Sequence, residues 1–209
     1  MAGGTAMSMH TDDWGRRVVE RASEFAEHCW VASAQHMLHG TDGDGCPVDT
    51  PDETWQGNTM TCGWWKPGEV NVGVPYGWGN ASTIEAFDAG IREGKYAGNV
   101  PEDKKRRVSR HTVGVDCSGL LTICWELPRR ISTREIPDYA SVIECVDDIR
   151  QGDVFAKVGG HVMFFVAFSD AERQEAVIID ATRSEGRVSR RKVSVPDLLA
   201  RGYKVFRKK

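Results

Sequence analysis

The stretch GVDCSGLL, residues 114–121, puts an aspartate, a cysteine and a serine where an extended segment gives way to a helix, predicted over 117–127. Unpaired N–H groups and partial positive charge at a helix start favour a thiolate at Cys117. The same N–H groups can hold the oxyanion of a tetrahedral intermediate, and Gly119 leaves room for a substrate backbone. The alternative interpretation is a buried cysteine in a helix that Asp116 caps.

A cysteine nucleophile needs a base, and the base needs an orienting partner. Of the six histidines, only His161 begins an apolar strand, HVMFFVAF at 161–168. In the next predicted strand, EAVIIDAT at 175–182, Asp180 follows the apolar run and can accept a hydrogen bond from the imidazole. Two alternatives stay open at this point: a turn histidine satisfied by backbone groups, and a strand-end aspartate that caps a turn.

The rest of the chain predicts an α+β fold. Residues 12–38 have the apolar spacing of one long helix, either continuous or broken once. Residues 81–97 have the spacing of a second helix, which Ser82 or Thr83 can cap. Further along, the apolar period changes to two or to continuous runs. These runs predict strands at 152–158, 161–168, 175–182, 186–193 and 203–208. Helices followed by antiparallel strands indicate an α+β domain with its helices on one face of a sheet.

Composition restricts the class of protein. The chain has 209 residues, 40% hydrophobic and 27% charged, which is typical of one soluble globular domain. A net charge of −3 gives no field that would attract nucleic acid or an anionic membrane. The basic runs KKRR (104–107) and SRRK (189–192) are predicted to be solvated loop or edge-strand residues.

The sequence shows no recognisable targeting segment, which predicts a cytoplasmic location. No apolar run approaches the ~18 residues of a membrane helix, so we expect no membrane insertion. The N-terminus also lacks the basic and apolar regions of a signal peptide. The predicted location is therefore cytoplasmic, or the cell envelope or exterior if an export signal was removed.

Metal and disulfide chemistry have little support in the sequence. The six cysteines form no CxxC pair, so a zinc ribbon or finger is not supported. A disulfide between Cys46 and Cys62 is one option, since they flank a loop rich in Pro, Gly and Thr. His28, His36 and His39 lie on or near the first predicted helix without an HExxH motif. We therefore expect no metal site, and we expect no cofactor.

Five segments, taken in order, resemble the NlpC family of papain-like cysteine peptidases and amidases. They are VPYGWGN (74–80), VDCSGLL (115–121), QGDVF (151–155), HVMFFVAF (161–168) and IDATRSEGRV (179–188). DCSG alone is moderately specific, whereas the ordered set is strongly so. The resemblance implies a papain-like (NlpC-type) α+β fold, with N-terminal helices packed against a mostly antiparallel sheet of about five or six strands.

The resemblance also implies a role for each catalytic residue. Cys117 matches the family's nucleophile and His161 its general base. Asp180 stands where the family has a third polar residue, most often His. This departure keeps the orienting role, because a carboxylate holds an imidazolium at least as well.

Three more residues match positions around the substrate. Tyr76 matches a tyrosine that the family uses in the oxyanion or substrate region. Asp116 and Ser118 match positions that, in cell-wall members, help to grip the free amine of a short peptide stem. The resemblance therefore implies a peptide or muropeptide-like small substrate, cut at a γ-glutamyl or other peptide amide.

The chain departs from the family in two places. A segment of about 40 residues, 77–116, stands where the family usually has a short link. The first 70 residues match no cell-wall-binding module. We expect a single domain over 1–209, with a helical and loop extension at 1–70 and an insertion at 81–113 that frames the cleft.

The expected function is hydrolysis of an amide bond by a cysteine peptidase or amidase, through a Cys-His-Asp triad and an acyl-enzyme. Two alternatives stay open: a non-catalytic ligand-binding protein on the same scaffold, and a thiol acyltransferase. The oligomeric state is not predicted.

Overall fold

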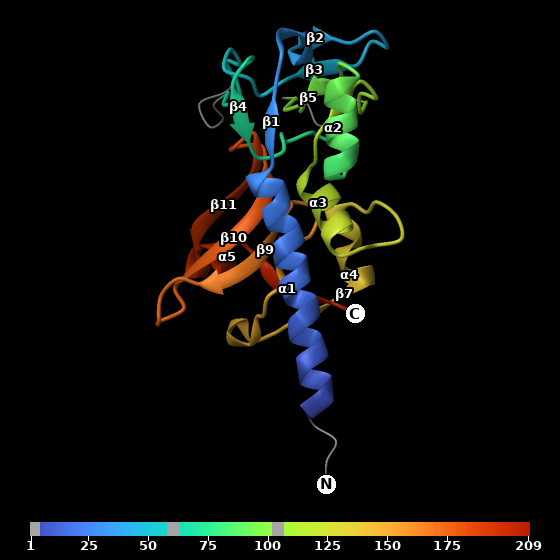
Figure 1. The fold of residues 1–209 in the computed structure, drawn as a ribbon. Helices are drawn as coiled ribbons and strands as arrows, with labels where there is room; N and C mark the ends of the chain where they lie inside the picture. Colours follow the sequence, from blue (N-terminus) through green and yellow to red (C-terminus); the bar gives the residue numbers. More distant parts are fainter. Residues whose placement is uncertain (1–4, 58–62, 102–106) are drawn as a thin grey trace.

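The computed structural model describes residues 5–57, 63–101 and 107–209 (Figure 1). The helices are α1 Thr5–Glu27, α2 Ile84–Arg92, α3 Cys117–Cys124, α4 Ile136–Tyr139 and α5 Val195–Ala200. The short 3-10 helices are η1 Ala34–His36, η2 Thr133–Glu135 and η3 Val146–Asp148. The strands are β1 Cys29–Val31, β2 His39–Thr41, β3 Pro47–Asp49, β4 Val70–Val72, β5 Tyr96–Ala97, β6 Thr112–Val113, β7 Ala140–Ile143, β8 Val154–Lys157, β9 His161–Phe168, β10 Glu175–Thr182, β11 Arg187–Ser194 and β12 Lys204–Lys208.

A six-stranded sheet organises the fold, with strand order β11-β10-β9-β8-β12-β7. Every pairing between these strands is antiparallel. Five of the strands lie where the sequence predicts them, because their apolar runs are long and bounded by turn residues. The prediction of an α+β fold with an antiparallel sheet of about five or six strands is confirmed. β7 was missed because it is a four-residue edge strand, too short to show a period.

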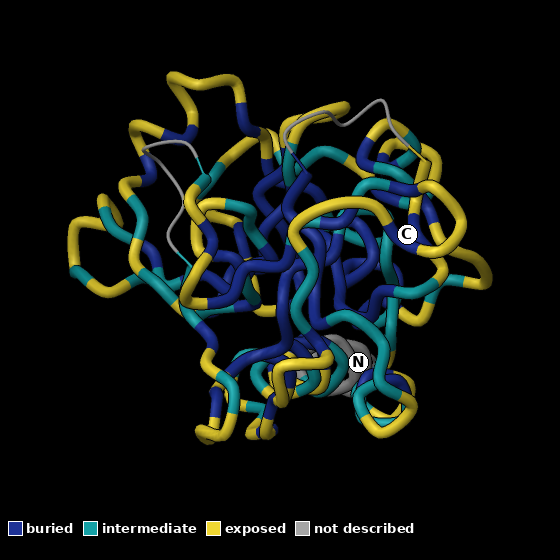
Figure 2. Tube along the Cα trace, turned by 90° about the horizontal axis from the view of Figure 1, so that it is seen from above, coloured by how far each residue is buried: buried dark blue, intermediate teal, exposed yellow. Residues whose placement is uncertain are grey.

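Helices cover both faces of this sheet. On one face, α1 and α3 lie against the sheet (Figure 1). They bury Phe25, Leu120 and Leu121 in one cluster with Phe164 and Ile179. The prediction that helices pack on one face is therefore incomplete, because α5 packs on the other face. That second core contains Met163, Phe165, Ile178, Val195 and Leu198. Figure 2 shows the buried residues gathered in the middle of the molecule and the exposed ones at its loops.

The first helix differs from the predicted 12–38 at both bounds: α1 begins earlier, at Thr5, and ends earlier, at Glu27. Backbone carbonyls at the end of α1 accept hydrogen bonds from a distant segment, with Val74 N donating to Phe25 O at 2.9 Å. Trp30 then leaves the helical path and packs edge-on against Phe87, with ring centroids 5.2 Å apart. Tertiary contacts override local helix propensity here.

The second helix is also shorter than the predicted 81–97. Thr83 is its N-cap, since its hydroxyl accepts from Ala86 N at 3.2 Å. The alternative cap, Ser82, instead accepts from Gly114 N at 3.3 Å. Gly94, with φ of +81°, turns the chain out of the helix. The residues after it form β5, which pairs in parallel with β6.

The predicted N-terminal extension supplies part of the main core. Val18, Ala22 and Phe25 of α1 are almost fully buried in the same cluster as α3 and the sheet. Within the predicted insertion, α2 packs Phe87 against Trp30, while Val108 lies near the predicted nucleophile, as described below. No helix in the described part of the chain is long and apolar enough to cross a membrane.

The expectation that Gly119 leaves room for a substrate is corrected by the packing of α3. A Cβ at this position would lie 2.3 Å from Asn80 O and 3.1 Å from Ala81 Cα. The missing side chain therefore lets the chain's own 80–81 segment approach the helix. This contact holds the start of α3 against the preceding loop.

We expect Gly119→Ala to lower the free energy of unfolding by about 1–3 kcal/mol, because backbone atoms must move to admit the methyl group. Urea denaturation measures this change. Gly43→Ala is the matched control, since nothing lies within 4 Å of a Cβ there. Equal stability of the Gly119→Ala variant and the wild type would contradict the packing argument.

Candidate active site

Cys117 is the first residue of α3, and its side chain is partly exposed. Asp116 caps the helix, with Oδ1 accepting from Gly119 N at 2.7 Å. A bridge between Val115 and Tyr76 guides the chain into this helix start. The amides of Cys117 and Ser118 donate to no acceptor within the described ranges. Two N–H groups therefore stay free next to the sulfur, as an oxyanion site requires.

The Asp116 carboxylate is buried and already holds four donors. Besides Gly119 N, Oδ1 accepts from the Ser118 hydroxyl at 3.0 Å. Oδ2 accepts from Gly79 N at 2.9 Å and from Arg130 Nη2 at 2.5 Å. The two residues predicted to grip a substrate amine thus bind each other and the surrounding chain. That amine-binding role stays a prediction, while the contacts make Asp116 the group that fixes the helix start.

His161 is presented by the turn between β8 and β9. It pairs with Lys157 across the two strands, and Gly159, with φ of +75°, makes the turn between them. His161 begins β9, and the period-two alternation of this strand puts its side chain on the same face as Met163 and Phe165. About a fifth of the side chain, 21%, is exposed. The imidazole is therefore fixed by the sheet yet accessible at its end.

Asp180 lies in β10 with a fully buried side chain. Its Oδ2 accepts from His161 Nε2 at 2.6 Å. On its other side it accepts from Arg191 Nη2 at 2.8 Å and Nε at 3.2 Å. Burial favours the neutral acid, but these hydrogen bonds and charges outweigh it and lower the pKa of Asp180. The carboxylate is thus held ionised between two cations.

The imidazole of His161 has an acidic group on each side. Burial lowers its pKa, but hydrogen bonds to Asp180 and Cys117, together with their negative charges, raise the pKa to about 10. Because Nε2 faces Asp180, Nδ1 is the nitrogen left for the sulfur. His161 therefore holds a proton at neutral pH, beside the nucleophile predicted from the sequence.

Tyr76 lies beside the same sulfur. Its side chain is 5% exposed. Burial and the negative charges of Cys117 and Asp116 raise its pKa well above the ordinary value. The phenol therefore stays neutral and can donate a hydrogen bond at the site. All the site residues predicted from the sequence lie around the start of α3 and the ends of β9 and β10.

Two cavities meet at Cys117. The first, of about 580 Å³, is lined by Tyr76, His161 and residues of β11 and α5. The second, of about 510 Å³, is lined by Asp116, Ser118, Arg130 and Val108. Val108 belongs to the predicted insertion. Trp78, Cys117 and Gly160 line both cavities. A substrate could therefore extend to either side of the sulfur.

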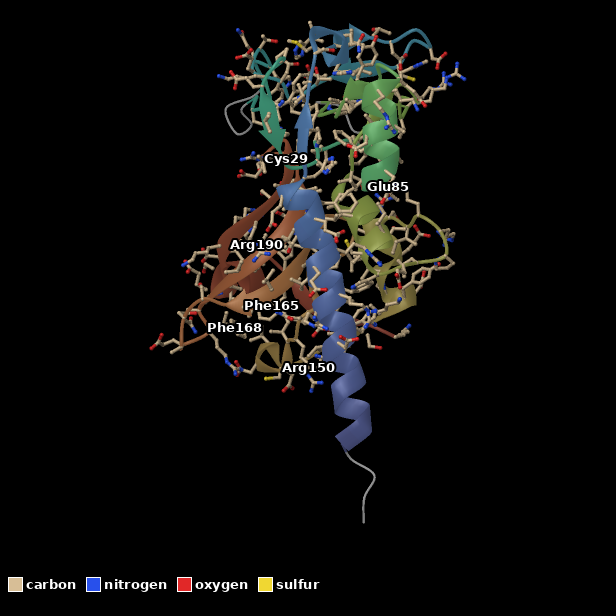
Figure 3. All side chains as sticks on the ribbon, viewed as in Figure 1. Cys29, Glu85, Arg150, Phe165, Phe168 and Arg190 are labelled. Carbon is tan, nitrogen blue, oxygen red and sulfur yellow. The ribbon has the colours of Figure 1, made fainter. Side chains whose placement is uncertain are left out.

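Three arginines at the site were not predicted. Arg130 pairs with Asp116, Arg191 pairs with Asp180, and Arg183 lines the larger cavity. The run SRRK (189–192) lies on the edge strand β11, as predicted, but Arg191 is not a freely solvated residue. Its neighbour Arg190 points to the opposite face and donates to Ser23 of α1 at 2.7 Å (Figure 3). Strand alternation could have separated these two residues, but the cross-strand partner depends on register.

The other cysteines and histidines lie in different settings. Within the described ranges, no group of three His, Cys, Asp or Glu residues could hold a metal ion. Cys46 is a buried free thiol, whereas its predicted partner Cys62 lies outside the described residues. His28 pairs with Asp88 at 2.7 Å. Most of the KKRR run (104–107) is likewise not described.

No protein-family model, curated protein or solved structure matches this chain. Its function must therefore be inferred from its own residues and their geometry.

Proposed function

We propose that this protein is a cysteine-dependent amide hydrolase, a peptidase or amidase of the papain-like NlpC type. One observation carries the proposal: the imidazole of His161 hydrogen-bonds to Asp180 and lines the same cavity wall as Cys117, whose negative charge helps to raise the pKa of His161. A nucleophile, a base and an orienting carboxylate in this order are the minimum set for acyl transfer. The order of the five resembling segments supports the same assignment.

In the acylation step, the sulfur of Cys117 attacks the carbonyl carbon of the substrate amide. The carbonyl oxygen becomes an oxyanion, which the free amides at the start of α3 can stabilise. His161 then gives its proton to the leaving nitrogen, and the C–N bond breaks. The products of this step are a thioester on Cys117 and a free amine.

In the deacylation step, His161 is neutral and takes a proton from water. The hydroxide that forms attacks the thioester carbonyl, and the C–S bond breaks. The acid leaves, and the thiolate–imidazolium pair of Cys117 and His161 is restored. Asp180 stays ionised throughout and stabilises the imidazolium.

The two cavities favour a substrate with groups on both sides of the scissile bond. One cavity can take the acyl portion and the other the leaving amine, since both reach Cys117. Their volumes, about 580 and 510 Å³, suit a short peptide or a muropeptide-like fragment. The substrate class is therefore proposed to be small peptide amides.

Iodoacetamide at stoichiometric level and neutral pH is expected to label Cys117 at least about tenfold faster than Cys29 or Cys145. If exposure decided reactivity, Cys29 and Cys145 would react first, because both are exposed and Cys117 is only partly so. The imidazolium of His161 is the physical reason for the reverse order. Peptide mapping of the adducts measures the three rates.

The matched control is His161→Ala, in which Cys117 should fall to the reactivity of the other cysteines. Equal labelling of Cys117 and Cys145 in the wild type would remove the basis for a nucleophile. Buried Cys124 should stay unlabelled in every variant, because burial raises its pKa.

A further inference from the structure

The larger cavity beside Cys117 is cationic. The described residues that line it include, besides His161, four Arg and Lys cations, Arg183, Arg191, Lys192 and Arg201, and one carboxylate, Asp197. A low-dielectric cavity whose walls carry an excess of one sign of charge concentrates ligands of the opposite sign. This composition indicates that the group bound here carries negative charge.

Three of the four cations already have partners. Arg191 binds Asp180, and Lys192 pairs with Glu175 at 2.7 Å. The guanidinium of Arg201 lies over the ring of Tyr203, 5.6 Å from its centroid. Their positions are thus explained by contacts within the chain.

Arg183 is different. Its Nε and Nη2 atoms are buried and have no hydrogen-bond partner among the residues that the structure describes. A buried polar group without a partner destabilises the folded state, and a charged group does so more strongly. Such destabilisation is expected at a site where a ligand supplies the missing acceptor.

The unpartnered nitrogens form the edge of the guanidinium that binds a carboxylate with two parallel hydrogen bonds. The chain itself uses this edge twice. Arg191 binds Asp180 through Nε and Nη2, and Arg207 binds Asp153 in the same way at 2.9 and 2.7 Å. In Arg183 the same edge is unused.

We propose that Arg183 binds a carboxylate of the substrate in this cavity, so that preferred substrates carry an acidic group close to the scissile amide. The inference rests on the proposed function, because it takes Cys117 as the reacting atom. Because the Nε and Nη2 atoms are covered in the free protein, binding requires the side chain to turn so that this edge faces the cavity. The carboxylate is either the C-terminal group of the substrate or an acidic side chain.

The first test compares two alkylating reagents of equal size, anionic iodoacetate and neutral iodoacetamide, at low ionic strength. The measured quantity is the ratio of their rates at Cys117. Arg183→Gln is expected to lower this ratio at least about threefold, because it removes the cation that attracts the anionic reagent. Arg190→Gln removes an equal charge from the opposite face of β11 and should leave the ratio unchanged (Figure 3).

The outcomes of this test separate the two proposals. If both reagents react no faster at Cys117 than at Cys29, the proposed function fails. If Cys117 is reactive but its ratio is the same in the wild type, Arg183→Gln and Arg190→Gln, the hydrolase survives and the carboxylate site is overturned.

The second test identifies the source of the carboxylate. Peptide amides are compared in two pairs: a free C-terminus against a carboxamide, and a glutamate side chain against glutamine. The wild type should prefer the acidic member of one pair at least about tenfold in kcat/KM, and Arg183→Gln should lose that preference. The pair in which the acidic member is preferred shows whether the carboxylate is the C-terminal group or a side chain. Hydrolysis without preference in both pairs overturns the proposal.

Discussion

Cys117→Ala is expected to abolish amide hydrolysis, with a loss of about 10⁴-fold or more in kcat, because no other group can form the thioester. Cys29→Ala and Cys145→Ala remove exposed thiols elsewhere and should keep the wild-type rate. The three variants together separate the loss of the nucleophile from the loss of any cysteine. The fold should survive in all of them, since Cys117 is only partly buried.

The experiment uses defined muropeptides, short peptide amides and simple acyl esters as substrates. Product masses show which bond is broken, and the mass of the intact protein shows whether an acyl group is attached at Cys117. Added amines show whether the acyl group passes to nitrogen rather than to water. Hydrolysis at the wild-type rate by the Cys117→Ala protein would refute the proposed mechanism.

Asp180→Asn is expected to lower kcat/KM by about 10²-fold or more. An asparagine amide can donate to Nε2 of His161, which would then keep its proton on Nδ1, the nitrogen facing Cys117. Such a histidine cannot take the proton of the thiol. The substitution also removes the negative charge that stabilises the imidazolium and that pairs with Arg191.

The same variant should change the pH profile in a defined direction. In the wild type, the pKa of His161 is raised from 6.5 to about 10, so the proton needed by the leaving amine is lost only as pH rises through that value. In Asp180→Asn the pKa falls, and the alkaline limb of kcat/KM moves to lower pH.

The free energy of unfolding should also fall as pH rises through the pKa of His161. A histidine whose pKa is raised by folding contributes stability that is fully present below 6.5 and is lost as pH rises toward about 10. Urea denaturation across this range should show a decline in the wild type that is weaker in Asp180→Asn. The measured midpoints therefore report the His161–Asp180 interaction without any substrate.

Asp147→Asn is the matched control, because it makes the same chemical change in an exposed ion pair, with Arg173, whose residues line neither cavity. An exposed ion pair of this kind is worth about 0–1 kcal/mol, and this one touches no proposed catalytic group. Its activity and pH profile should match the wild type. An Asp180→Asn protein with an unchanged rate and alkaline limb would show that Asp180 does not orient His161.

The fold was predictable where the apolar pattern is long and uninterrupted. β9 and β10 each carry eight residues with buried runs, and they were placed to the residue. The prediction failed at α1, whose pattern continued past Glu27, because the competing contacts come from Val74 and Phe87. Local periodicity contains no information on such distant partners.

The residues of the candidate site could also be predicted in part from the sequence and in part only from the tertiary structure. From the sequence alone came Cys117 at a helix start, His161 at the beginning of a strand and Asp180 late in the next, since each is a local feature of one segment. The pairing of Arg191 with Asp180 and the unpartnered edge of Arg183 were decided only by tertiary structure. Both depend on strand register and on side-chain burial, which long-range packing determines.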